Sequence, residues 1–359
     1  MTTVIPMQWL RARNAMVLLV LAGSLISKTA SAQEQSVSPF TDEATPDFAN
    51  ISYAPAEPED SKGHLLDLYL PENADGPVPV VIFTGGSAWF SDNTKEAARR
   101  IAPKLLAAEF AVAGVSIRSS TQAKFPAQVH DIKAAIRWLR ANAGTYNFDA
   151  NHIGIMGGSS GGWTSAMAAV TGDAPKLEGD LGVTSVSSAV QAAVAFYPPT
   201  NFLEMDRWAV RACKPGLEMQ AGFKTGEFCH DDERSPESSL IGCSIQDCPE
   251  KTLLADPVQY ITSADAPIMI LHGQSDLLVP HNQGERLYMA LNKACKDAVF
   301  LSLPLAGHGP VRGFLEDDTL RAGATLRTTS SAGCEATEPQ LVKPSWDLLI
   351  DFLNEKLRS

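Results

Sequence analysis

The chain has 359 residues, of which 45% are hydrophobic and 19% charged, and its formal net charge is −12. This length suits two average domains or one large α/β domain that carries insertions. The composition excludes wholesale disorder, because enough apolar residues are present to form a packed core. The acidic balance disfavours a nucleic-acid partner, since duplexes and phosphate-rich ligands attract basic surfaces.

The first 32 residues have the layout of a secretory signal peptide. Arg11 and Arg13 precede an apolar run at residues 15–26, and small residues at 30–32 precede a predicted cut before Gln33. The apolar run is shorter than the roughly 20 residues that span a bilayer, so we expect cleavage rather than a retained anchor. Cleavage removes three cations and no acid, which takes the formal net charge from −12 to −15. We therefore expect a secreted or periplasmic protein with no stable membrane span.

All six cysteines lie beyond the predicted cleavage point. An even number of cysteines in an exported chain predicts up to three disulfides. A zinc site is less favoured, because the chain has neither a C-x-x-C nor an H-E-x-x-H pattern. Many pairings are open to six cysteines, and the set that joins near neighbours is Cys213–Cys229, Cys243–Cys248 and Cys295–Cys334.

Apolar runs alternate with helical patterns after an extended leader at residues 33–58. The predicted strands are residues 64–70, 78–83, 111–117, 152–156, 192–197, 268–272 and 299–303. The predicted helices are residues 95–108, 126–143, 163–170, 283–294 and 345–356. Several strands are continuous apolar runs, as expected for strands that are buried on both faces. The alternation predicts a doubly wound, mostly parallel α/β sheet over residues 59–359.

Two stretches interrupt this alternation. Residues 198–265 hold four of the six cysteines and show no clean period. We interpret this stretch as a disulfide-bearing cap insertion over the carboxyl edge of the sheet, where active sites of open α/β sheets lie. A passive, disulfide-pinned loop is the alternative. Residues 312–344 are polar and rich in Gly, Thr and Ser, and they predict a surface excursion before the last helix.

The most informative motif lies at residues 152–163, with the sequence HIGIMGGSSGGW. A buried strand runs into small residues around a serine, and a helix follows, which is the context of the nucleophile elbow G-x-S-x-G. Either Ser159 or Ser160 fits the central position. The first glycine of an elbow directly follows its strand, and Met156 is the last strand-like residue, so we expect Ser159 to be the nucleophile. The Ser160 amide then lies at a helix start, which favours negative charge.

A nucleophilic serine needs a base, and the base needs an acid that holds its tautomer. In this architecture the chain order is Ser, then Asp or Glu, then His, each on a loop after a strand. Asp276 and His308 each follow a predicted strand, and we expect them to be the acid and the base. His281 is the rival base, but it opens a helix only five residues after Asp276. His272 ends a strand, and we expect it to be structural.

A glycine turn at residues 80–90, with the sequence VVIFTGGSAWF, follows another predicted strand. The backbone at such a turn can approach a substrate oxygen closely enough for its N–H groups to stabilise a tetrahedral anion. We expect Gly86 and Ser87, together with Ser160, to form this oxyanion hole. A purely structural tight turn is the alternative.

Six stretches of the chain carry a resemblance to a known family. They are 66–71 (LDLYLP), 124–140, the elbow at 157–162, 235–238 (SPES), 272–276 (HGQSD) and 307–309 (GHG). In these stretches the chain resembles the α/β-hydrolases, and among them the BD-FAE (feruloyl-esterase-like) branch near the hormone-sensitive-lipase-type esterases. Elbows of the form G-x-S-A-G-G in that family imply Ser159 as the nucleophile. The family often has H-G-G-x-W at the oxyanion turn, where this chain has Gly85 at the histidine position and Ser87 at the second glycine.

The residues and the resemblance together predict an exported serine carboxylesterase that acts on small carboxylic esters through an acyl-enzyme, with Ser159, Asp276 and His308 as its triad. The mechanism needs no metal or organic cofactor. The expected partner is a small-molecule or polysaccharide-borne ester, and acylated plant polysaccharide is implied by the resemblance alone. One alternative is a serine peptidase or amidase of the prolyl-oligopeptidase type, which normally carries a large amino-terminal propeller. The other is a catalytically inactive hydrolase-fold binding protein, which an intact Ser–Asp–His set disfavours.

Overall fold

The computed structural model describes residues 42–72, 74–172, 174–211 and 229–358. The predicted signal peptide, its cleavage point and Cys213 lie outside the described residues. Among the residues that are described, no helix is both long enough and apolar enough to cross a membrane.

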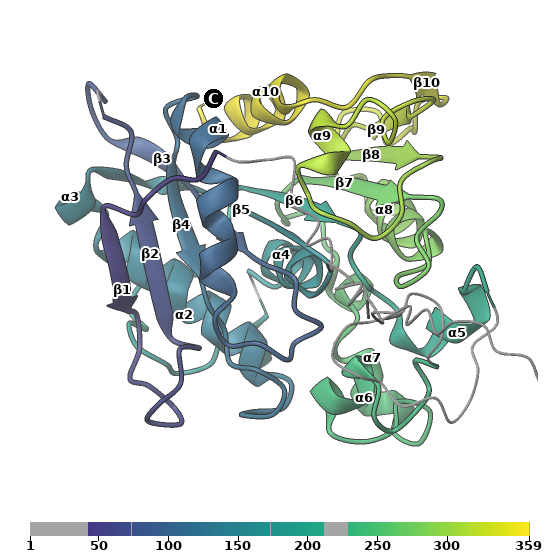
Figure 1. The fold of residues 1–359 in the computed structure, drawn as a ribbon, viewed down its shortest axis with the longest axis horizontal. Helices are drawn as coiled ribbons and strands as arrows, with labels where there is room; N and C mark the ends of the chain where they lie inside the picture. Colours follow the sequence, from purple (N-terminus) through teal and green to yellow (C-terminus); the bar gives the residue numbers. More distant parts are fainter. Residues whose placement is uncertain (1–41, 73, 173, 212–228, 359) are drawn as a thin grey trace, which may run out of the picture. The chain divides into compact units, whose positions relative to one another are not determined.

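A ten-stranded sheet with the order β1-β2-β4-β3-β5-β6-β7-β8-β9-β10 forms the centre of the described region (Figure 1). Its strands are β1 (Phe48–Ser52), β2 (Leu65–Tyr69), β3 (Val78–Thr84), β4 (Ala111–Val115), β5 (Phe148–Gly158), β6 (Ala192–Phe196), β7 (Ile268–Gly273), β8 (Ala298–Leu303), β9 (Thr325–Thr329) and β10 (Gln340–Leu341). The strands from β3 to β8 pair in parallel, whereas β1, β2, β9 and β10 pair antiparallel at the two edges. The predicted doubly wound, mostly parallel sheet is confirmed.

Helices cover both faces of the sheet. The helices whose apolar residues pack against it are α1 (Ala102–Leu106), α2 (Ala127–Ala141), α4 (Ser160–Val170), α8 (Asn282–Lys293), α9 (Gly313–Glu316) and α10 (Trp346–Leu357). Apolar residues of α2, α4 and α8 form one core against the sheet, and those of α1, α9 and α10 form the other (Figure 1). Strands β3, β4, β6 and β7 are buried along their whole length, which explains their continuous apolar sequences.

Every predicted strand and helix has a counterpart, but the helix predicted at 95–108 is divided. It consists of the 3₁₀ helix η1 (Thr94–Arg100) followed by α1. Pro103 lies in the first turn of α1, where its missing N–H and its ring are tolerated, whereas inside one continuous helix they would break it. Short elements that the periodicity does not show are α3 (Ala143–Tyr146) and η2 (Pro175–Leu177).

The predicted leader and the predicted excursion both contribute to the sheet. β1 lies within the leader and pairs with β2, whereas β9 lies within the excursion and pairs with β8. These edge strands have few buried residues, so their sequences lack the apolar pattern by which the central strands are recognised. The disulfide Cys295–Cys334 joins the end of α8 to the excursion, as the near-neighbour pairing predicts.

The cap lies between β6 and β7 and is made of short helices. These are η3 (Phe202–Glu204), α5 (Met205–Trp208), α6 (Pro236–Ile241), α7 (Pro249–Leu253) and η4 (Pro257–Tyr260). The predicted disulfide Cys243–Cys248 is present, and Cys229 is also disulfide-bonded. Apolar cap residues such as Phe202 and Ile241 pack with Trp89 and Trp163, so the cap rests on the turn after β3 and on the start of α4.

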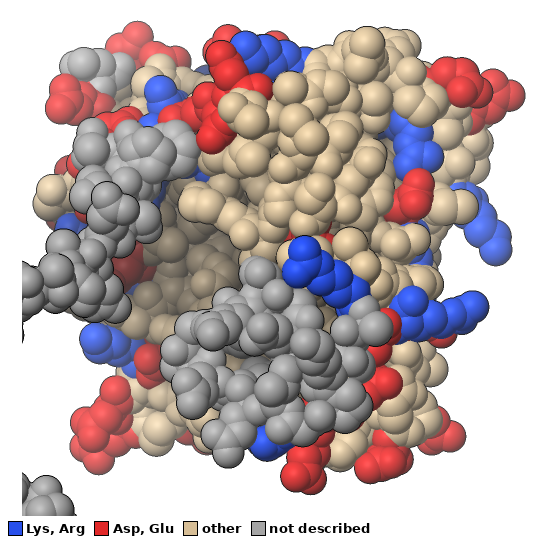
Figure 2. All heavy atoms as spheres, turned by 45° about the vertical axis from the view of Figure 1, so that its right-hand side comes forward, with Lys and Arg blue, Asp and Glu red and all other residues tan. Residues whose placement is uncertain are grey.

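On the face drawn in Figure 2, the visible Lys and Arg side chains are dispersed among acidic ones.

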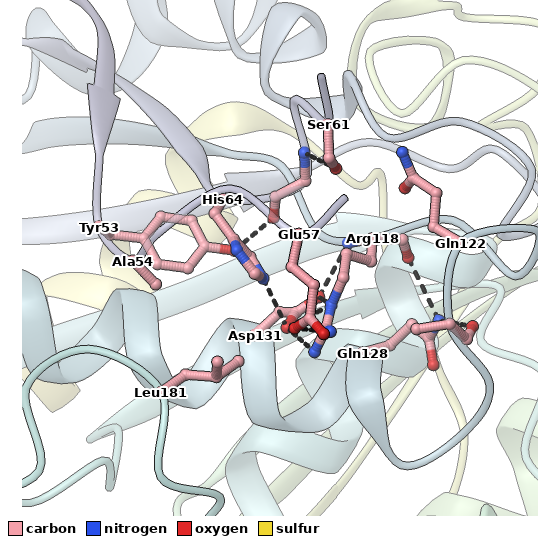
Figure 3. A network of polar contacts seen from close by, with 12 residues as sticks. Tyr53, Ala54, Glu57, Ser61, His64, Arg118, Gln122, Gln128, Asp131 and Leu181 are labelled. Carbon is pink, nitrogen blue, oxygen red and sulfur yellow. Dashed lines mark hydrogen bonds and ion pairs between the residues drawn. The ribbon is translucent and has the colours of Figure 1, made fainter. Parts of the chain in front are cut away.

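A buried ion network ties the segments around β2 and β4 to α2 (Figure 3). The Asp131 carboxylate of α2 accepts hydrogen bonds from His64 Nε2 at 3.0 Å and from Arg118 Nη2 at 2.7 Å. Arg118 also pairs with Glu57 of the leader. Burial lowers the pKa of His64, but the adjacent Asp131 carboxylate outweighs this effect and raises the pKa above its usual value. The network therefore fastens the leader to the core of the fold.

Candidate active site

The turn between β5 and α4 holds Ser159 in a positive-φ backbone conformation that residues with a side chain rarely adopt. Its φ is 58° and its ψ is −125°, which is costly for a residue with a side chain. The Ser159 N–H donates to the carbonyl of Phe196 at 3.0 Å, and the Ser159 carbonyl accepts from the N–H of Trp163 at 2.9 Å. Hydrogen bonds to β6 and α4 thus hold the serine in the geometry of a nucleophile elbow.

Close backbone packing explains why glycines surround this serine. A Cβ on Gly157 would lie 2.6 Å from the carbonyl oxygen of Gly161, and one on Gly161 would lie 2.2 Å from that of Thr84. A Cβ on Gly162 would also be too close, at 2.5 Å from the carbonyl oxygen of Phe196. Because glycines are required in both possible registers of the motif, they do not by themselves choose between the two serines.

The hydrogen bonds of the two serines separate their roles. Ser160 is buried, and its Oγ accepts the backbone N–H of Ser87 at 2.9 Å. Its carbonyl oxygen accepts the hydroxyl of Thr164 within α4. Ser159 is only partly buried and carries the strained backbone of the elbow. The geometry therefore favours Ser159 as the reactive hydroxyl, whereas the Ser160 hydroxyl holds the turn after β3.

The structure brings Asp276 and His308 together across the ends of β7 and β8. Asp276 Oδ2 lies 2.9 Å from His308 Nδ1, and Asp276 Oδ1 accepts the N–H groups of Leu278 and Val279, each at 2.9 Å. Asp276 is fully buried, whereas the His308 side chain is 16% exposed. Burial raises the pKa of Asp276, but the hydrogen bond and charge of His308 outweigh it, and the pKa is held below its usual value. Asp276 is therefore a carboxylate at neutral pH.

The elbow and the histidine loop meet at Tyr197. Its ring centroid lies 4.5 Å from that of His308, and its hydroxyl oxygen is 2.6 Å from the position that a Cβ on Gly158 would occupy. Among the described residues, no hydrogen bond joins Ser159 to His308. Such contacts often tighten only when substrate is bound, so this geometry does not argue against a Ser–His pair.

The turn after β3 packs directly against the serine. A Cβ on Gly86 would lie 2.8 Å from the Cβ of Ser159 and 2.6 Å from the carbonyl oxygen of Gly158. Ala88 and Trp89 follow with φ values of 50° and 58°, so the turn is tightly constrained. The Ser87 amide already donates to Ser160 Oγ. The amides next to Ser159 that are not used in this bond are therefore those of Gly86 and Ser160. The Ser160 amide belongs to the first turn of α4, where N–H groups have no intrahelical partner.

The two other histidines near Asp276 have structural contacts. His272 is fully buried, its Nε2 lies 2.9 Å from the Val279 carbonyl, and it is 3.7 Å from Asp276 Oδ2. Burial lowers the pKa of His272 to about 4, so it is neutral at physiological pH. His281, the rival base of the sequence analysis, has its Nε2 2.9 Å from Ser302 Oγ. Among the described residues, no cluster of three or more His, Cys, Asp or Glu side chains is suited to a metal ion.

The buried, neutral His272 should make the protein less stable as the pH falls from about 6.5 to about 4. The unfolded chain binds a proton at His272 below about pH 6.5, whereas the native chain resists until about pH 4. This difference lowers the free energy of unfolding by up to ~3 kcal/mol across that window. Urea unfolding at pH 7, 5.5 and 4 measures the effect, and His272→Gln should show a shallower pH dependence than the parent chain. His152, whose side chain is 31% exposed and pairs with Asp149, provides the control variant His152→Gln. Parallel curves for the parent and His272→Gln would contradict the prediction.

The strand order, with a serine elbow after β5 and an acid and a histidine after β7 and β8, defines the α/β-hydrolase fold. Residues 66–291 match the model of the family described as BD-FAE, and the chain belongs to this family.

Curated and solved relatives agree with this family. Esterase LipC of Mycobacterium tuberculosis is 26% identical over 261 residues, which cover 70% of this chain and 58% of LipC. The chain spans just over half the length of the curated relatives that it matches, at 55 to 58% for three of them. A solved structure described as a truncated form of a carbohydrate esterase from gut microbiota is 31% identical, with a TM-score of 0.67 and coverage of 89% of this chain and 98% of that one. A bifunctional GH43-CE protein of Bacteroides eggerthii is also 31% identical, with a TM-score of 0.68, and the match covers 86% of this chain and 38% of that one.

Proposed function

We propose that the chain is an exported serine carboxylesterase, with Ser159 as nucleophile, His308 as base and Asp276 as the acid that orients the base. The single observation that carries this proposal is the 2.9 Å contact between Asp276 Oδ2 and His308 Nδ1, at the sheet edge that also holds the Ser159 elbow. The names of the relatives, which include esterases and a carbohydrate esterase, support the ester-cleaving activity.

The proposed reaction has two stages. The Ser159 hydroxyl attacks the ester carbonyl while His308 Nε2 takes its proton, and the same proton passes to the departing alcohol oxygen as the carbon–oxygen bond breaks. Water then attacks the acyl-enzyme and gives its proton to His308, which returns it to Ser159 as the acid is released. Asp276 holds His308 with Nδ1 protonated and stabilises the imidazolium that forms in each stage.

The negative oxygen of each tetrahedral intermediate needs donors that are already in place. We assign this role to the amides of Gly86 and Ser160, which flank Ser159. The Ser87 amide, which the sequence analysis includes in the hole, bonds Ser160 Oγ in this arrangement and so fixes the turn beside the hole.

The proposed substrates are small carboxylic esters, either free or carried on a polysaccharide. The carbohydrate esterase among the solved relatives supports esters carried on a polysaccharide, because nearly the whole of that protein matches this chain. Export is supported by the predicted signal peptide at residues 1–32 and by the disulfides Cys243–Cys248 and Cys295–Cys334, which are typical of oxidising compartments.

Hydrolysis of p-nitrophenyl acetate, butyrate and octanoate tests the proposed function. The full chain is expressed with export and purified with its disulfides formed, and sequencing of its first residues should begin at Gln33. We expect turnover that is absent from a Ser159→Ala preparation made in the same way. Folded protein without activity on any of the three esters would overturn the proposal, and cleavage of peptide or amide substrates would then favour the peptidase alternative.

A further inference from the structure

Tyr197 occupies a constrained position at the end of β6, between the elbow and the histidine loop. It is buried, with an exposed fraction of 4%, and its φ of 38° is unusual for a residue with a large side chain. Its N–H donates to the carbonyl of Leu271 in β7 at 2.7 Å. A strained, buried residue of this kind persists only where its surroundings hold it in place, and such residues concentrate at functional sites.

The first set of contacts joins Tyr197 to the loop that carries His308. The phenol hydroxyl donates to the Gly309 carbonyl at 2.5 Å, one residue beyond the histidine. The ring lies against the imidazole, with 4.5 Å between the centroids and 58° between the planes. Burial raises the pKa of the Tyr197 phenol, so the hydroxyl stays protonated and donates throughout the working pH range.

The second set of contacts joins the same hydroxyl to the elbow. A Cβ on Gly158 would lie 2.6 Å from Tyr197 Oη, 3.0 Å from Tyr197 Cζ and 3.0 Å from Val311 Cγ2. Position 158 is the x that precedes the serine in G-x-S-x-G, and the motif itself does not require glycine there. Tyr197 therefore accounts for a glycine that the turn does not explain, and it sets how closely the histidine loop approaches Ser159.

We propose that Tyr197 is a positioning residue for His308: its hydroxyl fixes the histidine loop against the elbow, and its ring face stabilises the imidazolium. A cation held within about 6 Å of an aromatic ring is attracted to the negative ring face. Among the described residues, the other titratable groups near His308 are the Asp276 carboxylate and His272, and His272 is neutral down to about pH 4. This inference rests on the proposed function, because it assigns Tyr197 a part in the turnover of esters.

Two substitutions separate the hydroxyl from the ring. Tyr197→Phe keeps the ring and loses the bond to Gly309, so kcat for p-nitrophenyl acetate should fall about tenfold with KM unchanged, because the loop loses about one hydrogen bond of positioning. Tyr197→Leu also loses the ring, so kcat should fall further. The acid limb of its kcat–pH profile should move down by about half a pH unit, because the imidazolium loses the ring face. Tyr197→Phe should keep the parent's acid limb.

A matched control is Tyr288→Phe in α8. Tyr288 is a buried tyrosine, with 1% of its surface exposed, and its hydroxyl has no hydrogen-bond partner among the residues that the structure describes. Removal of that hydroxyl should leave kcat, KM and the pH profile unchanged. Circular dichroism and urea unfolding show whether each variant is folded. If Tyr197→Leu does not fold, the result for Tyr197→Phe alone decides the proposal.

The contact with the elbow is tested by combining Gly158→Ala with Tyr197→Phe. Gly158→Ala alone should lower kcat at least a hundredfold, because the new methyl group forces Tyr197 and the histidine loop away from Ser159. Removal of the Tyr197 hydroxyl in the same chain should recover part of that loss. Multiplicative effects of the two substitutions would contradict the proposed contact.

The possible results distinguish this inference from the proposed function. An active parent enzyme whose Tyr197→Phe variant has the parent's kcat, KM and pH profile would overturn the role of Tyr197 and leave the esterase proposal intact. A parent enzyme that is folded but inactive on every ester would overturn the proposed function and, with it, the role of Tyr197. A loss confined to KM would place Tyr197 in substrate binding and would also overturn the positioning role.

Discussion

Ser159→Ala should lower kcat for ester hydrolysis by a factor on the order of 10⁵ to 10⁶, because loss of the nucleophile removes the acyl-enzyme route altogether. The stability of the protein should change little. The Ser159 side chain is partly exposed, and within the described part of the chain Ser159 makes its hydrogen bonds through its backbone N–H and carbonyl. Active-site titration of the parent and the variant with a p-nitrophenyl ester checks the loss of the nucleophile, since the burst of p-nitrophenol should disappear, and urea unfolding checks the stability.

Ser160→Ala is the matched control for this prediction. It removes the acceptor of the Ser87 N–H but leaves both the Ser159 hydroxyl and the residue 160 amide in place. We expect a loss of kcat near tenfold, with the burst retained, because the turn after β3 loses one hydrogen bond. If Ser159→Ala kept its activity while Ser160→Ala lost it, the nucleophile would be Ser160 and the assignment of the elbow would be wrong by one residue.

Asp276→Asn should lower kcat by a factor on the order of 10⁴, because the asparagine forces the wrong histidine tautomer. Asn Oδ1 can still accept the N–H groups of Leu278 and Val279, where Asp276 Oδ1 now accepts them. The amide NH₂ then faces His308 Nδ1, which must accept a hydrogen bond, so the proton moves to Nε2. A histidine that is protonated at Nε2 cannot take the proton of Ser159. Steady-state kinetics with p-nitrophenyl acetate measures the loss.

A second buried carboxylate tests whether the replacement of any buried carboxylate by an amide lowers kcat. Asp256 is 2% exposed and pairs with Arg286 at 2.6 Å. Asp256→Asn should lower the free energy of unfolding and leave kcat near the parent value. If Asp276→Asn and Asp256→Asn reduced kcat equally, the effect of Asp276→Asn would come from altered packing rather than from the tautomer of His308.

Local sequence signals are strong where the chain is buried on both sides or where a turn has one steric solution. The central strands are largely apolar runs. Gly157, Gly161 and Gly162 are needed because other backbone atoms lie within 2.6 Å of where their Cβ atoms would be. The edge strands β1, β9 and β10 were not predicted, because exposed strands held by antiparallel pairing need no apolar pattern.

By itself, the sequence determined the fold class, the order of the central elements and the loops that carry Ser159, Asp276 and His308, because each of these depends on residues close together in the chain. Only the tertiary structure decided which groups meet. It placed Asp276 Oδ2 2.9 Å from His308 Nδ1, and it gave the Ser87 N–H to Ser160 Oγ. It also placed the Tyr197 side chain between His308 and Gly158, which no motif indicates. These contacts join segments that are 32 to 112 residues apart, and the packing of the sheet edge, which brings such segments together, leaves no periodic or local signal in the sequence.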